Sequence, residues 1–287
     1  MTKNIGRSIK TRLLNLAKEE KQEYMKVLVR YLHERLLFRI SASPYKSNFL
    51  LKGSSLLFAL DGFKARPTID IDLLGECISN ERESLKETFE KICNIECEDD
   101  GVTYDATSLE LEPIAVEKKY LGTCVKVVAH LDTIVQQISV DIGFGDVVTP
   151  YPLSLDYPLL LPNVPAVELY AYSLETLIAE KFHAMVDRDE SNSRMKDFFD
   201  VYQLFANHII DRELLSEAIV CTFKNRNTPY RANLMLFSDK FATDTTRNAL
   251  WKAFLKKIRW KERLEFSVVM KCIKENLQEY WSEAILG

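Results

Sequence analysis

The sequence contains no run of about eighteen apolar residues, the length that a membrane-spanning helix requires. Its first twenty residues mix charged and apolar side chains and show no secretory leader. The six cysteines are scattered, and the four histidines form no close ligand pairs. The sequence therefore predicts a soluble, cytoplasmic protein with reduced thiols, without a membrane partner and without a zinc site.

An excess of positive charge is also absent, because 38 lysines and arginines are outnumbered by 42 aspartates and glutamates. A net charge of −4 argues against a protein that coats nucleic acid without specificity, so any such binding needs a local basic patch. The sequence has no internal repeats or low-complexity tracts. Its 287 residues are enough for two domains.

The spacing of apolar residues predicts a mixed α+β fold. Helical spacing occurs in residues 8–40, with a break near 18–22, and again in residues 79–93. Four later segments have the alternating or continuous apolar pattern of strands, namely 101–104, 108–114, 122–130 and 135–144.

A proline-rich segment, residues 149–165, separates this region from a helical pattern that continues to the end of the sequence. We therefore expect a first domain over residues 1–165, in which helices flank a mixed β-sheet. The second domain, over residues 166–287, is expected to be an α-helical bundle.

The stretch from Lys52 to Leu74, KGSSLLFALDGFKARPTIDIDLL, combines a turn, a helix and a strand. Gly53 permits a tight turn, and Ser54 or Ser55 is placed to cap the helix that follows. The free N–H groups at the start of a helix favour a bound phosphate.

In the strand of this stretch, Asp70 and Asp72 share one face while apolar residues point to the other. Two neighbouring carboxylates repel each other unless a cation lies between them, and their oxygens suit Mg²⁺. A third carboxylate, Asp141, projects from a later strand, on a face whose other residues, Ser139 and Gly143, are small. Asp132 and Asp146 are the competing candidates for this place.

A second set of charged residues lies beyond the proline-rich segment. Lys181 lies on or beside the apolar stripe of a helix that Ser173 is expected to cap, so it either needs an anionic partner or extends its charge to solvent. Arg194, Asp197 and Asp200 follow one helical turn apart. They form either a simple surface ion pair or a charged network that includes Lys181.

The Gly-Ser turn followed by Asp-x-Asp resembles the DNA polymerase beta type nucleotidyltransferase superfamily. Two longer segments, LKGSSLLFAL…RPTIDIDLL and YSLETLIAEKFHAMV…NSRMKDFFDVYQL, resemble the AbiEii/AbiGii toxin family of nucleotidyltransferases, which occurs in toxin–antitoxin and phage-defence operons. The resemblance covers about two thirds of the chain. It implies a nucleotidyltransferase domain followed by a helical domain that closes the active-site cleft.

The resemblance also implies roles for individual residues. Nucleotide binding is implied for a set that comprises Gly53, Ser54, Ser55, Arg66, Lys181, Arg194 and Asp200. Catalysis is implied for Asp70, Asp72, Asp141, Lys181 and Asp197, although either Asp197 or Asp200 fits the essential acid. Asp70, Asp72 and Asp141 would bind Mg²⁺ or Mn²⁺.

The implied reaction transfers a nucleoside monophosphate from an NTP to an acceptor hydroxyl, such as a tRNA 3′ end, and releases pyrophosphate. A cognate antitoxin is the implied partner. Two alternatives remain open at this point: nucleotidylation of a protein or small molecule, and a protein without catalytic activity that binds a nucleotide or an antitoxin.

The segment KAFLKKIRWKER, residues 252–263, concentrates positive charge in an acidic protein. With Trp260 exposed, it could hold an RNA backbone. The alternative is a solvated helix end, where basic residues are favoured by the helix dipole.

Overall fold

The computed structural model describes residues 5–116 and 120–282. The chain divides into two compact units: unit 1 contains residues 1–145 and 153–171, and unit 2 contains residues 146–152 and 172–287. This division differs from a single boundary after residue 165, because residues 167–171 form a strand of the unit 1 sheet.

Unit 1 contains a seven-stranded sheet in the order β3-β4-β5-β2-β1-β7-β6. The β1–β7 and β2–β5 pairs are parallel and the other pairs are antiparallel, so the sheet is mixed, as the sequence predicts. The strands are β1 Phe49–Lys52, β2 Asp70–Gly75, β3 Val102–Val116, β4 Tyr120–Leu131, β5 Ile134–Phe144, β6 Leu153–Tyr157 and β7 Val167–Ala171.

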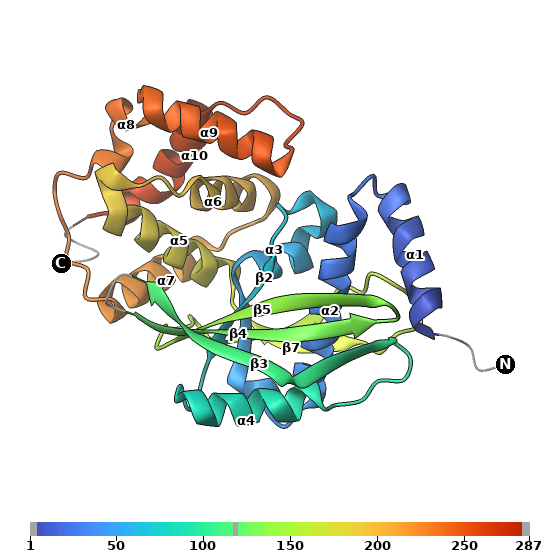
Figure 1. Ribbon diagram of the computed structural model, residues 1–287. Coiled ribbons are helices and arrows are strands. Elements are labelled where there is room, and N and C mark those ends of the chain that lie inside the picture. The colour runs from blue at the N-terminus through green and yellow to red at the C-terminus, as the bar shows by residue number, and fades with distance from the viewer. Residues whose placement is uncertain (1–4, 117–119, 283–287) are drawn as a thin grey trace. The chain divides into compact units, whose positions relative to one another are not determined.

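The described residues of unit 1 contain four α-helices, and α4 lies along β3 (Figure 1). Residues 20–23 separate the first two helices, where the sequence predicts a break. The helices are α1 Ile5–Glu19, α2 Tyr24–Ala42, α3 Gly53–Asp61 and α4 Arg82–Cys93.

One face of the sheet is apolar, as strand alternation predicts. Ile71 and Leu73 of β2 and Val140 and Ile142 of β5 are at most 1% exposed. Helices α2 and α4 pack on this side: the Phe49 ring of β1, for example, meets a phenylalanine ring of α4 edge to face, with centroids 5.6 Å apart. The opposite face of β2 and β5 is therefore left for polar side chains.

Two local features differ from the sequence-based expectation. The segments expected as separate strands at 101–104 and 108–114 form one strand, β3, whose register with β4 shifts between Asp105 and Glu110. Strand β7 falls where a helical pattern was expected, although its residues alternate between buried and exposed. The short β6 lies at the sheet edge, which is where strands next to prolines are tolerated.

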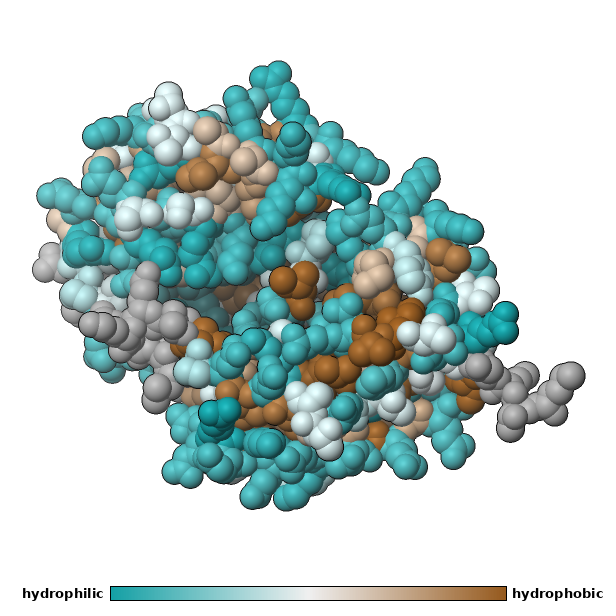
Figure 2. All heavy atoms as spheres, viewed as in Figure 1, coloured by the Kyte–Doolittle hydropathy of each residue, from teal (hydrophilic) through white to brown (hydrophobic). Residues whose placement is uncertain are grey.

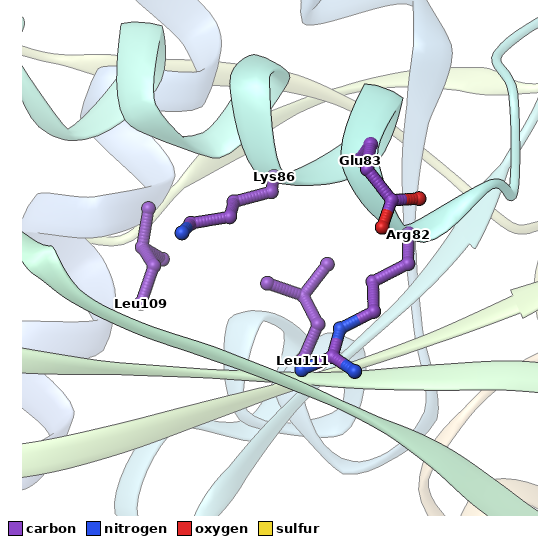
Figure 3. Close-up of a pocket in the computed structure, with 5 residues that line it drawn as sticks. All are labelled: Arg82, Glu83, Lys86, Leu109 and Leu111. Carbon is purple, nitrogen blue, oxygen red and sulfur yellow. The ribbon is translucent and has the colours of Figure 1, made fainter.

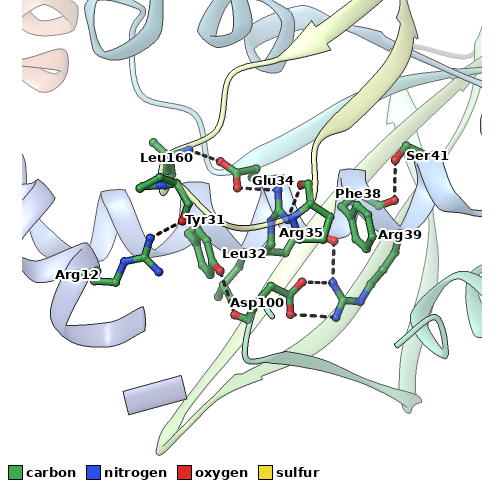
Figure 4. A network of polar contacts seen from close by, with 12 residues as sticks. Arg12, Tyr31, Leu32, Glu34, Arg35, Phe38, Arg39, Ser41, Asp100 and Leu160 are labelled. Atoms are coloured by element: carbon green, nitrogen blue, oxygen red, sulfur yellow. Dashed lines mark hydrogen bonds and ion pairs between the residues drawn. The ribbon is translucent and has the colours of Figure 1, made fainter. Parts of the chain in front are cut away.

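Buried charged side chains join α2 to the segment that enters β3 (Figure 4). Arg39 donates to the Asp100 carboxylate at 2.7 Å and to the Val102 carbonyl at 2.7 Å. Arg39 is 1% exposed and Asp100 is fully buried. The Tyr31 hydroxyl donates to the Asp100 backbone carbonyl at 2.9 Å. Each buried charge thus has a partner, which is the condition for keeping it inside a core.

In the described residues of unit 2, the regular secondary structure consists of helices joined by loops, which agrees with the α-helical prediction for this part of the chain. Its core is aromatic: the ring centroid of Phe198 is 5.4 Å from that of Phe266, and the Trp251 centroid is 5.5 Å from Phe266. The helices are α5 Leu174–Arg188, α6 Met195–Asn207, α7 Arg212–Asn225, α8 Asp239–Thr243, α9 Thr245–Ile258 and α10 Phe266–Leu277.

Over residues 5–116 and 120–282, no helix is both long enough and apolar enough to cross a membrane.

We predict that Asp100→Asn lowers the free energy of unfolding by about 3 kcal/mol, because it leaves the buried Arg39 guanidinium without its anionic partner. Urea unfolding followed by circular dichroism measures this change. The matched control is Asp99→Asn, since Asp99 is the adjacent exposed aspartate. Equal stability of the two variants would show that the Arg39–Asp100 pair does not stabilise the fold.

Candidate active site

The turn between β1 and α3 brings a helix start against a strand aspartate. Gly53 has a φ of +60°, a conformation that favours glycine. A Cβ atom on Gly53 would lie 2.2 Å from Oδ2 of Asp72, so this backbone can approach Asp72 only without a side chain. Glycine is therefore required here for two reasons, the backbone conformation and the close contact.

The first turn of α3 is capped by Asp72. The backbone N–H of Ser54 donates to Asp72 Oδ2 at 3.0 Å. The prediction of a serine cap is wrong, because the N-cap residue is Lys52 and its side chain makes no capping hydrogen bond. A carboxylate fits this position because the first N–H groups of a helix lack partners within it and carry partial positive charge.

Ser54 and Ser55 lie inside the first turn and are buried. The Arg66 guanidinium donates to Ser54 Oγ at 2.5 Å. The Ser55 hydroxyl donates to the backbone carbonyl of Asp70 at 3.3 Å. The structure thus places Arg66 and both serines beside the aspartate strand, within one small region of unit 1.

The aspartates of β2 and β5 share one face of the sheet. In the parallel β2–β5 pair, Asp72 is in register with Asp141, and Asp70 with Ser139. Residues in register on neighbouring strands point to the same side. All four are partly exposed, opposite the apolar face. The β2–β5 register therefore places Asp141 beside Asp72, on the face that strand alternation in the sequence indicates.

The two competing aspartates lie elsewhere. Asp132 is in the turn between β4 and β5, where it pairs with Lys10 at 3.0 Å. Asp146 belongs to unit 2 and pairs with Arg226 at 2.7 Å. Neither residue extends the row that contains Asp72 and Asp141.

Two further residues join this row and were missed from the sequence. Lys52 is in register with Asp72 on β1, and Cys124 with Asp141 on β4. Burial and a hydrogen bond with Asp141 raise the pKa of the Cys124 thiol to about 12, so Cys124 remains a thiol at neutral pH. The position of Lys52 directly before Gly53 could have indicated that Lys52 lies at the site. The proximity of Cys124 to Asp141 depends on the β4–β5 register, which the sequence does not show.

The fit of a metal ion to the aspartate face depends on the donor atoms that the face offers. Within the described parts of the chain, no three His, Cys, Asp or Glu side chains converge to form a metal-binding group. The donor chemistry nevertheless suits Mg²⁺, because Asp70, Asp72 and Asp141 offer hard oxygens on one face. Mg²⁺ is usually held by one or two carboxylates together with substrate phosphates, and this face can supply those carboxylates.

A second charged cluster lies within unit 2, on α5 and α6. The Lys181 ammonium lies 2.6 Å from Oδ2 of Asp200 and 3.3 Å from Oδ1 of Asp197. The three side chains are buried, with Lys181 only 8% exposed. The alternative in which Lys181 extends its charge to solvent is therefore wrong. The expected N-cap of α5 is present, since Ser173 Oγ accepts from the Thr176 N–H at 3.0 Å.

Arg194 completes the cluster by donating to Oδ2 of Asp197 at 2.8 Å. Burial would raise the pKa of Asp197, but the positive charges of Lys181 and Arg194 outweigh burial and hold the pKa below its usual value. Asp197 is therefore ionised at neutral pH. Of the two alternatives that the sequence leaves open, the charged network is the one present, with Lys181 shared between the two aspartates.

A separate pocket of about 290 Å³ lies between the first turns of α4 and strand β3. Figure 3 shows the side chains that line it: Arg82, Glu83, Lys86, Leu109 and Leu111. Leu111 is in register with the buried Val125, so the pocket belongs to the apolar side of the sheet and not to the aspartate face.

Solved structures with some likeness to the chain include JHP933 from Helicobacter pylori, with 15% identity, a TM-score of 0.43, and coverage of 87% of this chain and 94% of that one. An antigenic nucleotidyltransferase-like protein from Paracoccidioides brasiliensis also has 15% identity, with a TM-score of 0.35 and coverage of 83% and 92%. A search of curated proteins finds no match.

The family comparison is more specific. The model of the family described as "Nucleotidyl transferase AbiEii toxin, Type IV TA system" matches residues 35–272. The match spans most of the chain and contains both charged clusters, from Gly53 to Asp200. The chain therefore belongs to the AbiEii family of nucleotidyltransferase toxins, as the two sequence segments indicate.

Proposed function

We propose that the chain transfers a nucleoside monophosphate from an NTP to the 3′ hydroxyl of a tRNA. The acceptor oxygen forms a bond to the α-phosphorus, the bond from that phosphorus to the β-phosphate oxygen breaks, and pyrophosphate leaves. The acceptor proton passes to a carboxylate of the aspartate face. Membership of the nucleotidyltransferase family supports this reaction class.

The observation that carries the proposal is the register of β2 and β5. It aligns Asp72 with Asp141 on a partly exposed face, directly beside the helix start at Gly53 and Ser54. Carboxylates in such a row can hold a cation, and the N–H groups of a helix start suit phosphate oxygens. The two features together suit a metal-bound triphosphate.

We propose that Asp70, Asp72 and Asp141 hold Mg²⁺ or Mn²⁺ together with the NTP phosphates. A bound divalent ion would neutralise charge on the triphosphate and polarise the phosphoryl oxygens. The NTP phosphates would be positioned by the residues around the start of α3, namely Gly53, Ser54, Ser55 and Arg66. Holding the substrate in one orientation lowers the barrier to transfer.

Lys181 and its neighbours are proposed to act in the same reaction. Lys181 supplies a positive charge for an NTP phosphate, and Asp197 and Asp200 orient its ammonium group. Arg194, which is more exposed than Lys181, is a second cation for the nucleotide. Asp197 remains the proposed essential acid, because two cations keep it ionised.

The biological setting of the proposal is a toxin–antitoxin pair. Modification of tRNA ends blocks translation, so the chain would slow growth unless its cognate antitoxin is present, and such a block would also limit phage multiplication. NTPs and tRNA are cytoplasmic, and we therefore propose a cytoplasmic location.

We predict that Asp72→Asn lowers the rate of transfer by about 10²-fold or more, because it removes a charge that binds the metal. The assay measures transfer of label from each α-labelled NTP to total tRNA with Mg²⁺. An asparagine oxygen can still accept from the Ser54 N–H, so the helix cap survives. The control is Asp132→Asn, the same change in the β4–β5 turn.

Label on protein instead of RNA would contradict the tRNA acceptor and favour protein nucleotidylation. No transfer to any acceptor, with NTP binding intact, would favour a binding protein without catalytic activity.

We predict that Gly53→Ala abolishes transfer, whereas Gly62→Ala does not. Both glycines have positive φ, and Gly62 combines φ of +58° with ψ of −135°, so alanine at either position strains the backbone by roughly 1–3 kcal/mol. Only at Gly53 would the new Cβ collide with Asp72, since no atom lies within 4 Å of a Cβ at Gly62. Transfer assays and thermal unfolding of both variants separate the two effects. Equal transfer rates in the two variants would show that the close approach of residue 53 to Asp72 is not needed for catalysis.

We predict that Lys181→Ala relieves toxicity, but this variant also removes the Lys181 ammonium group from the buried Asp200. The double variant Lys181→Gln, Asp200→Asn avoids that problem because it keeps two side chains that can hydrogen-bond. We expect it to fold and to raise the KM for NTP about tenfold or more, the effect of losing one hydrogen bond to a charged group. An unchanged KM and kcat would make Lys181 a structural residue only.

A further inference from the structure

The last turns of α9 and the loop that follows form a basic surface on unit 2, called here the basic ridge. Hydrophilic side chains project over this part of unit 2 in the space-filling view (Figure 2). The side chains of the ridge are exposed lysines and arginines: Lys252, Lys256, Lys257, Arg259, Lys261 and Arg263.

The helix dipole does not account for the whole ridge. It favours basic residues only within the last turn of a helix, which here contains Lys256 and Lys257. Lys252 lies more than a turn before the end of α9, and Lys261 lies beyond it. A helix end that is merely solvated would not need cations on both sides of its last turn.

The ridge contains little negative charge to offset these cations, although Arg263 at its end pairs with Glu265 at 2.9 Å. Helix α9 contains no aspartate or glutamate, and Glu262 is the one acidic residue in 252–263. Lys252 and Lys256 are four residues apart on one helix face, and like charges at this spacing destabilise a helix by a few tenths of a kcal/mol. Since the whole chain has a net charge of −4, the ridge stands out from an otherwise acidic protein.

The ridge has no exposed aromatic side chain to stack on bases. The expectation of an exposed Trp260 is wrong: this ring is only partly exposed and meets the Phe199 ring edge to face at 5.1 Å. Trp251 is buried. Single-stranded nucleic acid is usually bound by stacking on aromatic side chains, whereas a surface of cations alone contacts phosphates.

We propose that the basic ridge binds the phosphate backbone of the acceptor RNA, through a structured region and not through unstacked bases. This inference rests on the proposed function, because it names the surface of unit 2 that binds the acceptor. Phosphate contacts are independent of sequence, so the ridge positions many RNAs and leaves the choice of the reacting hydroxyl to other residues.

The test compares wild-type full-length protein with the triple variant Lys252→Gln, Lys256→Gln, Lys257→Gln. Fluorescence anisotropy with labelled total tRNA gives Kd between 50 and 200 mM salt. Each lost phosphate contact reduces the slope of log Kd against log salt by about one, so we expect a reduction of about three. The KM for tRNA should rise, while kcat at saturating tRNA and the KM for NTP stay unchanged.

The matched control is Lys18→Gln, Lys86→Gln, Lys224→Gln, which changes the net charge equally at exposed positions on three separate helices. The same loss of affinity in the control would overturn the inference, because net charge alone would then explain binding. Unchanged tRNA affinity in the ridge variant would also overturn it, as would binding of the ridge to phosphatidylserine vesicles in place of tRNA.

The outcome for the proposed function is separate. If wild-type protein labels only protein, the proposed tRNA acceptor fails, and loss of tRNA affinity in the ridge variant alone still supports a ridge that binds RNA. If wild-type protein labels tRNA and the ridge variant does so with an unchanged KM, the inference fails and the proposed function stands.

Discussion

The parallel pairing of β2 with β5 is the constraint on which unit 1 depends. Its register places Ile71 beside Val140 and, one residue later, Asp72 beside Asp141. The first pair is buried under helices, and the second faces the other way. A slip of one residue would exchange the faces and bury the carboxylates in the core. The same hydrophobic burial that stabilises the sheet therefore also aligns the carboxylates.

The two charged clusters are neutralised in different ways. In unit 2, Lys181 is buried between two carboxylates, and the positive charge is balanced by side chains of the chain itself. In unit 1, three aspartates lie on one partly exposed face with Lys52 in the same row. Carboxylates on one face offer the oxygen atoms that a divalent cation binds, whereas the cluster in unit 2 contains its own cations. The aspartate face of unit 1 suits a ligand that brings a cation with it. The cluster of unit 2 suits a lysine that is held in one position before any ligand binds.

The sequence predicts where helices and strands lie along the chain better than it predicts which elements pair with each other. Apolar periodicity indicates α1, α2, α4 and most strands, because those patterns are local. It misses β7, since VELYA is short and its pairing with β1 is made across more than a hundred residues. In the site, alternation indicates Asp70, Asp72 and Asp141, and a resemblance indicates Lys181. Asp72 as the cap of α3 and Cys124 as the neighbour of Asp141 depend on three-dimensional contacts that no local pattern contains.

The path of the chain between the two units has a consequence for how the protein is made. Residues 146–152 belong to unit 2, yet the chain then returns to unit 1 for β6 and β7. A ribosome must therefore synthesise part of the second unit before it can supply the last two strands of the first. The nascent sheet has an open edge at β1 until residue 171 has emerged, and no single cut in the gene yields both units whole.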